Sequence, residues 1–151
     1  MYPRGMWNYF RSAFFADLDD ATAEGLMSSY SQVPNEVSEL HIHHLGGAMG
    51  RVSADATAFG TRDRDFILNV VARTPDAAGY DTAVEWARST TAALGPNAAA
   101  YVNFTGEAST DLVRASYPPG TYERLVAVKD RYDPTNMFRL NQNIPPSAGK
   151  S

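Results

Sequence analysis

A phenol and an amide stand two residues apart at Tyr101 and Asn103. In an extended segment, residues i and i+2 emerge on the same face, so these two side chains would point in the same direction. Together they can hydrogen-bond a heterocycle or a substrate hydroxyl. The alternative is a structural tyrosine that packs its ring and pairs its hydroxyl within the core.

The three histidines of the chain, His41, His43 and His44, fall in one short segment. On a strand, His41 and His43 share a face and His44 lies on the other. A His-x-His pair can supply two ligands to a zinc or copper site. Because the chain has no cysteine and no obvious third ligand nearby, we expect no metal. The alternative to a functional role is a pair of solvated histidines on an edge strand.

The elements that must position these groups alternate irregularly along the chain. Apolar and aromatic runs predict strands, or extended segments, over residues 1–16, 39–45, 65–73 and 98–104. Asp17 or Asp19 can cap a first helix, and further helices are expected over 80–94, 111–117 and 122–132. Without glycine-rich turns from strand to helix, this order favours the α+β class: an antiparallel sheet covered by helices on one face.

Composition narrows the possible functions. The chain has 151 residues, of which 44% are hydrophobic and 20% are charged, and this is typical of one globular core. A net charge of −4 argues against nucleic acid as a partner. The absence of cysteine excludes disulfides, thiolate nucleophiles and a cysteinyl-flavin bond within these residues. No export signal or membrane-length apolar stretch is present, so we expect a soluble, cytoplasmic chain with no membrane partner.

The last third of the chain carries four short motifs in order. They are Tyr-Val-Asn-Phe at 101–104, Arg-Ala-Ser-Tyr at 114–117, Tyr-Glu-Arg-Leu-Val-Ala-Val-Lys at 122–129 and Tyr-Asp-Pro-Thr-Asn-Met-Phe-Arg at 132–139. Asn-Gln-Asn-Ile-Pro-Pro follows at 141–146. In order and spacing, this series resembles the C-terminal signature of the berberine bridge enzyme-like flavoprotein oxidases. The resemblance extends from about Trp7 to Pro146.

The resemblance implies a role for each of the conspicuous polar residues. Tyr101 would lie over the flavin ring and remove a substrate proton, or assist in removing it, while hydride passes to FAD. A free tyrosine is a poor base at neutral pH, so the fold would have to supply a positive charge or a hydrogen-bonding partner for the phenolate. Asn103, Asn141 and Asn143 would help to form the isoalloxazine site. By residue chemistry alone, Asn141 and Asn143 are turn and capping groups.

The strand that precedes Gly46-Gly47 would face the substrate, which makes His43 a candidate acid-base or substrate-binding group. Asn69 stands where some plant relatives place glutamine, and the alternative for Asn69 is a satisfied buried amide. Two departures from the family pattern are present. The usual Pro-His-Arg is replaced by Gly-Thr-Arg at 60–62, and the lysine of some plant relatives is replaced by Ile67. The partner of Tyr101 is therefore not identified by the sequence.

The function implied by the resemblance is oxidation of an alcohol, sugar hydroxyl or amine-type carbon, with FAD as hydride acceptor and O2 as final electron acceptor. We assign residues 1–97 to part of a substrate-binding domain, 98–146 to the C-terminal berberine-bridge-like segment and 147–151 to a disordered tail. No glycine-rich loop for a pyrophosphate is found, so FAD would bind only with a complementary flavin-binding domain or subunit. The alternatives are a catalytically silent fragment or partner subunit, and a small metal-binding module built on His41 and His43.

Overall fold

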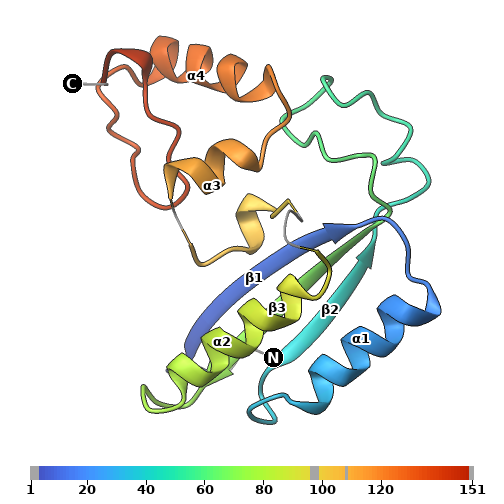
Figure 1. Ribbon diagram of the computed structural model, residues 1–151. Coiled ribbons are helices and arrows are strands. Elements are labelled where there is room, and N and C mark those ends of the chain that lie inside the picture. The colour runs from blue at the N-terminus through green and yellow to red at the C-terminus, as the bar shows by residue number, and fades with distance from the viewer. Residues whose placement is uncertain (1–3, 96–98, 108, 150–151) are drawn as a thin grey trace.

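The computed structural model describes residues 4–95, 99–107 and 109–149 of the chain (Figure 1). Three strands and four α-helices alternate within these ranges, with two short 3-10 turns. In order they are β1 (Trp7–Phe15), α1 (Asp20–Ser31), β2 (Glu39–His44), β3 (Phe66–Thr74), α2 (Tyr80–Ala92), η1 (Val102–Phe104), α3 (Thr110–Ala115), α4 (Thr121–Tyr132) and η2 (Ser147–Gly149).

The strands form one antiparallel sheet in the order β1-β3-β2. β3 is the central strand, and all its residues from Ile67 to Thr74 are buried. A run of Ile, Leu and Val suits a strand that is covered on both faces. Only Asn69, Arg73 and Thr74 bring polar side chains into it. The predicted strands over 39–45 and 65–73 are confirmed to within one residue at each end.

Helices α1 and α2 lie on the same face of the sheet (Figure 1). Their apolar residues meet alternate residues of β1 and β3, among them Tyr9, Leu68 and Val70, in one hydrophobic core. Trp86 of α2 is part of this core, and its indole N–H donates to the Ser29 carbonyl of α1 at 2.9 Å. The α+β class, with an antiparallel sheet and helices on one face, is therefore confirmed.

The helix ends follow the local chemistry of the sequence. Asp19, and not Asp17, caps α1, because its carboxylate accepts a hydrogen bond from the Thr22 N–H at 2.8 Å. α4 starts after Gly120, whose φ of 82° places it in the left-handed region. The Glu123 carboxylate accepts from the Gly120 N–H at 3.1 Å and completes that end. The helix predicted over 80–94 is α2, which ends two residues earlier, at Ala92.

The strand or extended segment expected over 98–104 is correct as extended chain at Tyr101 and wrong for residues 102–104. Tyr101 is extended, but Val102–Phe104 forms the 3-10 turn η1. The segment nevertheless follows the outer edge of β1, where the Phe14 N–H donates to the Ala99 carbonyl at 3.0 Å. At the next position, the Tyr101 N–H donates to the Ser12 hydroxyl and not to a backbone carbonyl of β1. The pairing therefore does not continue as a strand. Ala98 lies outside the described residues.

The C-terminal part contains α3 and α4, which lie apart from α1 and α2 (Figure 1). Asp133 orders the turn that follows α4: it pairs with Lys129 and accepts from the N–H groups of Met137 and Phe138. Ser147–Gly149, expected to belong to a disordered tail, forms η2, where Asp130 accepts from the Ser147 N–H at 2.7 Å. Residues 150 and 151 lie outside the described part.

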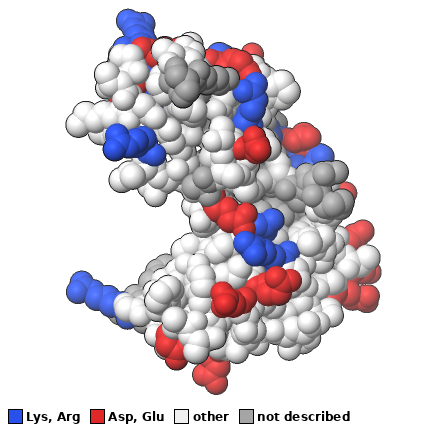
Figure 2. All heavy atoms as spheres, turned by 60° about the vertical axis from the view of Figure 1, so that its left-hand side comes forward, with Lys and Arg blue, Asp and Glu red and all other residues white. Residues whose placement is uncertain are grey.

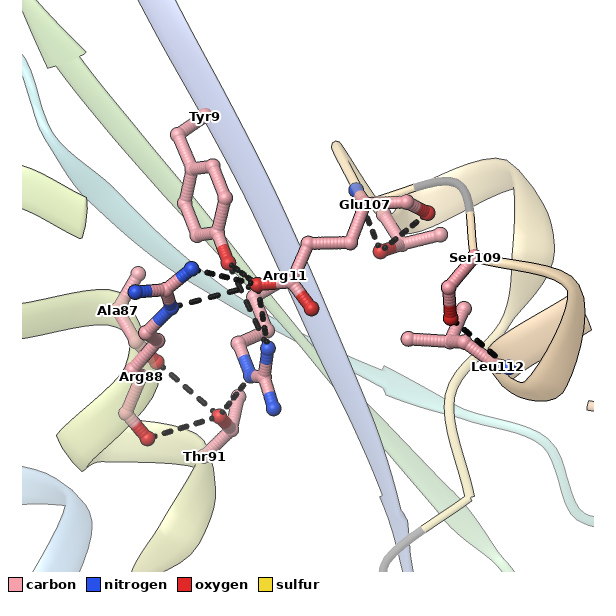
Figure 3. A network of polar contacts seen from close by, with 9 residues as sticks. Tyr9, Arg11, Ala87, Arg88, Thr91, Glu107, Ser109 and Leu112 are labelled. Carbon is pink, nitrogen blue, oxygen red and sulfur yellow. Dashed lines mark hydrogen bonds and ion pairs between the residues drawn. The ribbon is translucent and has the colours of Figure 1, made fainter. Parts of the chain in front are cut away.

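A carboxylate at Glu107 ties the C-terminal part to the sheet (Figure 3). The Tyr9 hydroxyl donates to it, and Arg11 and Arg88 each pair with it at 3.0 Å. The Arg11 guanidinium also donates to the Thr91 hydroxyl at 2.9 Å. One carboxylate thus joins β1, α2 and the segment that carries Tyr101. The hydrogen bond from Tyr9 and the two arginines hold the pKa of Glu107 below its ordinary value.

Charges of both signs are intermixed on the face of the molecule shown in Figure 2, where acidic and basic side chains meet at the hollow between its upper and lower parts. Opposite charges placed together pair with each other and do not create a field of one sign. Within the described residues, no helix is both long and apolar enough to span a bilayer.

The Glu107 network predicts a specific acid sensitivity. Because the pKa of Glu107 is lower in the folded chain than its unfolded value of about 4.3, its contribution to stability is present above that pH and lost as the pH falls through the folded-state pKa. The thermal midpoint of Glu107→Gln should therefore depend less steeply on pH below about 4.3 than that of the parent. Thermal unfolding followed by circular dichroism at a series of pH values measures both slopes.

Glu24→Gln, on an exposed turn of α1, is the matched control and should keep the parental slope. Parallel curves for the parent and Glu107→Gln would show that the network does not hold the two parts together.

Candidate functional site

The sheet face opposite α1 and α2 carries the polar residues selected from the sequence. Because residues that are directly paired across strands share a face, Ser12, Asn69 and His41 form one row across β1, β3 and β2. The next row is Phe14, Ile67 and His43. The sheet thus brings two candidates, Asn69 and His43, to adjacent rows of one face.

Ser12 fixes the position of Tyr101. Its hydroxyl accepts a hydrogen bond from the Tyr101 N–H at 2.9 Å and donates to the Tyr101 carbonyl at 3.4 Å. Farther along the same edge of β1, the Gly106 N–H donates to the Phe10 carbonyl at 2.8 Å. These bonds, together with that between Phe14 and Ala99, anchor the segment on both sides of η1.

Three phenylalanine rings surround the half-buried ring of Tyr101. The centroid distances are 6.4 Å to Phe14, 5.7 Å to Phe59 and 5.2 Å to Phe104, and each pair is edge to face. Such contacts are a preferred aromatic geometry and restrict the orientation of the phenol. The rings come from β1, from the loop after β2 and from η1, so three separate segments of the chain define one orientation.

Asn103 supplies the hydrogen-bonding partner that the sequence left unidentified. Its amide nitrogen donates to the phenolic oxygen of Tyr101 at 2.8 Å. A donor at this oxygen stabilises negative charge there when a proton leaves, and it leaves the phenolic hydrogen free to donate elsewhere. The structure therefore places Tyr101 and Asn103 together, with Tyr101 directly before the 3-10 turn and Asn103 within it, and not in one extended segment as predicted.

His43 lies beside this aromatic group. Its ring centroid is 5.6 Å from that of Phe104, which in turn contacts Tyr101. His41 is its neighbour on the same strand face, with a centroid distance of 6.2 Å. No group of three or more His, Cys, Asp or Glu side chains that could hold a metal ion occurs in the part of the chain that the structure describes.

Glu39 links His41 of β2 to Arg73 of β3. One of its oxygens is 2.6 Å from His41 Nε2, and the other accepts from Arg73 Nη1 at 3.0 Å. The Arg73 side chain is only 3% exposed. The hydrogen bonds from Arg73 and then from His41 hold the pKa of Glu39 below its ordinary value, so this carboxylate stays ionised at neutral pH.

Asn69, between Ser12 and His41 in the first row, is buried. It is 5% exposed, and its carbonyl oxygen Oδ1 has no hydrogen-bond partner in the described part of the chain. The alternative of a fully satisfied buried amide is therefore wrong for this oxygen. An unsatisfied acceptor in such a place is costly, and it suits a site in which a bound molecule supplies the donor.

The asparagines of the C-terminal loop are less directly connected to Tyr101. Asn141 has a φ of 59°, typical of a turn, and its carbonyl accepts from the Asn143 N–H at 2.9 Å. Between them, the Gln142 amide donates to the Thr105 carbonyl at 3.1 Å. The loop thus contacts the segment that carries the Tyr101 turn, while the cofactor role of Asn141 and Asn143 stays a prediction.

The loop between β2 and β3 explains one departure from the family pattern. Gly60 is packed so closely against Pro118 that an added Cβ would lie 2.0 Å from the proline Cγ. A proline at position 60 would not fit there. Arg62 keeps the loop in shape, since it donates to the Met49 carbonyl and the Thr57 hydroxyl at 2.8 Å each and lies over the ring of Phe59.

Comparison with known proteins adds a family to this geometry. A family described as berberine and berberine like matches residues 100–145. An uncharacterized FAD-linked oxidoreductase, YgaK of Bacillus subtilis (strain 168), is 33% identical over 114 residues, which are 75% of this chain and 25% of that protein. (R)-6-hydroxynicotine oxidase of Paenarthrobacter nicotinovorans is 47% identical over 45 residues, 30% of this chain and 10% of the oxidase.

Among solved structures, berberine bridge enzyme from Eschscholzia californica superposes with a TM-score of 0.79 at 21% identity, over 100% of this chain and 35% of that one. This similarity shows a shared fold. The chain belongs to the berberine bridge enzyme-like family of FAD-linked oxidoreductases. It spans 25% and 35% of the lengths of YgaK and of the berberine bridge enzyme chain, respectively.

Sequence reasoning missed several residues that position Tyr101 in this family member. Ser12 is the clearest case. It is a small polar residue inside the apolar strand β1, and its isolation among Phe and Ala was the available signal. Phe14 and Phe59 were not among the predicted site residues. Their approach to the Tyr101 ring depends on contacts between segments distant in the sequence, which no local pattern reveals.

The Ser12 anchor predicts a measurable loss of stability. In Ser12→Ala the buried edge would lose the acceptor for the Tyr101 N–H, and leaving a buried donor unpaired costs about 1–3 kcal/mol. The urea midpoint should fall while the slope of unfolding stays at the parental value. Ser28→Ala, an exposed substitution on α1, is the control and should leave the midpoint unchanged or slightly raised. An unchanged midpoint in Ser12→Ala would show that Tyr101 is held by other contacts.

Proposed function

We propose that this chain forms the substrate-side wall of an FAD-dependent oxidase that oxidises an alcohol, a sugar hydroxyl or an amine-type carbon. The observation that carries the proposal is the Tyr101 phenol, held by three phenylalanine rings and bonded at its oxygen by the Asn103 amide. The substrate classes are supported by the names of similar proteins, which include a hydroxynicotine oxidase and a chitooligosaccharide oxidase.

The residues present fit one part of FAD. A planar aromatic surface and amide groups suit the isoalloxazine ring, and the unsatisfied Asn69 oxygen is an acceptor on the same side of the sheet. A pyrophosphate needs backbone N–H groups at a glycine-rich turn before a helix, and the described residues contain no such turn. The contacts to the rest of FAD would come from polypeptide outside these residues, either in the same protein or in a separate subunit.

When bound, FAD supplies the hydride acceptor. Tyr101, in its phenolate form, takes the proton of the substrate hydroxyl or amine at its phenolic oxygen and becomes the neutral phenol as the hydride leaves the neighbouring carbon. Asn103 stabilises the charge on that oxygen through its N–H donor. His43 and Asn69 orient the polar end of the substrate, and the phenylalanine rings around Tyr101 exclude water from the proton transfer.

Exposed apolar residues support the need for a complementary surface. Met137, Phe138 and Leu140 in the loop after α4 are 73%, 75% and 84% exposed. Contiguous apolar exposure of this kind marks an interaction surface. The aromatic strand β1, by contrast, is largely buried. The second candidate function is a subunit without activity of its own. The exposed loop after α4 favours it, whereas the largely buried strand β1 does not.

The 151-residue chain alone should bind FAD weakly, because it offers ring-side contacts but no cradle for the pyrophosphate. Titration of the purified chain with FAD, followed by flavin fluorescence, measures this. Addition of a complementary flavin-binding portion of a relative, in trans or by fusion, should increase the affinity. Tight stoichiometric quenching by the chain alone would contradict the division of the site between two parts.

Tyr101→Phe tests the chemical role. With a complementary flavin-binding portion present, this variant should bind FAD nearly as the parent does, since the ring that packs against Phe104 remains. The rate of flavin reduction by substrate should fall about 10²- to 10⁴-fold, the usual contribution of a positioned acid-base group. Asn103→Ala should alter the flavin spectrum and stability as well. Stopped-flow measurement of flavin reduction gives this rate for each variant. A parental rate in Tyr101→Phe would show that the Tyr101 hydroxyl takes no part in the mechanism.

A further inference from the structure

His41 lies beside a carboxylate that is itself paired with an arginine. Its Nε2 is 2.6 Å from an oxygen of Glu39, while the other oxygen of Glu39 receives a hydrogen bond from Arg73. Nδ1 of His41 makes no hydrogen bond to the residues that the structure describes. One ring nitrogen is therefore committed to the carboxylate and the other is available.

The direction of these bonds follows from the chemistry of the groups. A guanidinium can only donate, and an ionised carboxylate can only accept. The nitrogen that faces Glu39 must then carry the proton of the neutral imidazole. Nδ1 is left as the basic nitrogen with a free lone pair.

His41 lies on the sheet face that carries the candidate site. His41 pairs directly with Asn69 across the sheet, and its ring is 6.2 Å from that of His43, which packs on Phe104. We propose that Arg73 and Glu39 hold His41 as the Nε2-protonated tautomer, so that its Nδ1 accepts a hydrogen bond from the O–H or N–H group of the substrate. The proposal rests on the oxidase function above: His41 contacts substrate, while Glu39 and Arg73 are positioning residues.

This arrangement extends the site beyond Tyr101. Tyr101 acts on one proton of the substrate, whereas His41 would bind a second donor group on the sheet side. Substrates with two neighbouring O–H or N–H donors, as in a sugar or an amino alcohol, would use both. Because the His41 side chain is one-third exposed, a bound molecule can reach its ring.

Glu39→Gln gives a sharp test. Arg73 still only donates, so it selects the amide oxygen of Gln and turns the NH2 group toward His41. His41 Nε2 must then accept, and the proton moves to Nδ1. Nitrogen-15 NMR of the labelled chain alone, at a pH where imidazole is neutral, distinguishes a protonated ring nitrogen from an unprotonated one. We expect Nε2–H in the parent and Nδ1–H in Glu39→Gln.

Two comparisons make the result specific. The exposed Glu36→Gln should keep the parental tautomer, and the signals of His43 and His44 serve as internal references. Glu39→Asp keeps the charge next to Arg73 but is too short to reach the ring, and should give a mixture of tautomers. A parent with the proton on Nδ1 or with mixed tautomers, or a Glu39→Gln variant that keeps it on Nε2, would overturn the proposal.

The chain alone is used for this measurement, so its outcome does not depend on the Tyr101 mechanism. In the assembled oxidase, Glu39→Gln should lower kcat/KM about tenfold, the equivalent of one hydrogen bond of about 1.4 kcal/mol. Glu36→Gln should leave kcat/KM unchanged. A tautomer exchange with no loss of kcat/KM would remove His41 from substrate binding and leave the role of Tyr101 standing.

Discussion

The attachment of residues 99–107 to the outer edge of β1 is the interaction on which the candidate site depends. Two backbone hydrogen bonds, the Ser12 hydroxyl and the Glu107 carboxylate hold this segment against the sheet. Without it, Tyr101 and Asn103 would belong to a connecting loop with no fixed relation to the sheet. With it, the Tyr101 ring contacts Phe14 of β1, Asn103 bonds to the Tyr101 hydroxyl, and His43 of β2 reaches the same group through Phe104. The edge that would otherwise expose unpaired backbone groups becomes the support of the site.

The two faces of the sheet separate stability from chemistry. On one face, Tyr9, Leu68 and Val70 pack against α2 and Trp86 in a continuous apolar core. On the other, the Asn69 carbonyl oxygen and Nδ1 of His41 have no hydrogen-bond partner among the described residues. Unsatisfied groups of this kind reduce stability, and they persist in proteins where function uses them. The strand β3 contributes to both faces, because alternate residues of a strand point in opposite directions.

The regular elements were largely predictable because their signals are local. The apolar run of β3, the cap of α1 by one of two candidate aspartates and the end of α4 at Tyr132 depend on neighbouring residues only, and the structure has them where the sequence indicated. The contacts of the site were less predictable. Ser12 and Tyr101 are 89 residues apart, and Phe14 and Phe59 also come from segments distant from Tyr101 in the sequence, so a local pattern carries no information about these contacts. The family resemblance indicated Tyr101 as a candidate site residue, but it did not indicate which residues fix the position of its side chain.

Tyr101 and Asn103 were expected to point the same way because they would lie in one extended segment. Their side chains do lie together, but through a different backbone geometry. In a strand, side chains two apart lie roughly 7 Å from each other and run parallel, too far for the amide to reach the phenolic oxygen directly. The 3-10 turn curls the backbone after Tyr101, and the Asn103 amide then donates at 2.8 Å. At Tyr101 the N–H bonds to the Ser12 hydroxyl and not to a backbone carbonyl of β1, and the turn follows directly after it. A single hydroxyl in an apolar strand thus anchors the residue before the turn, and the turn brings the Asn103 amide to the phenolic oxygen.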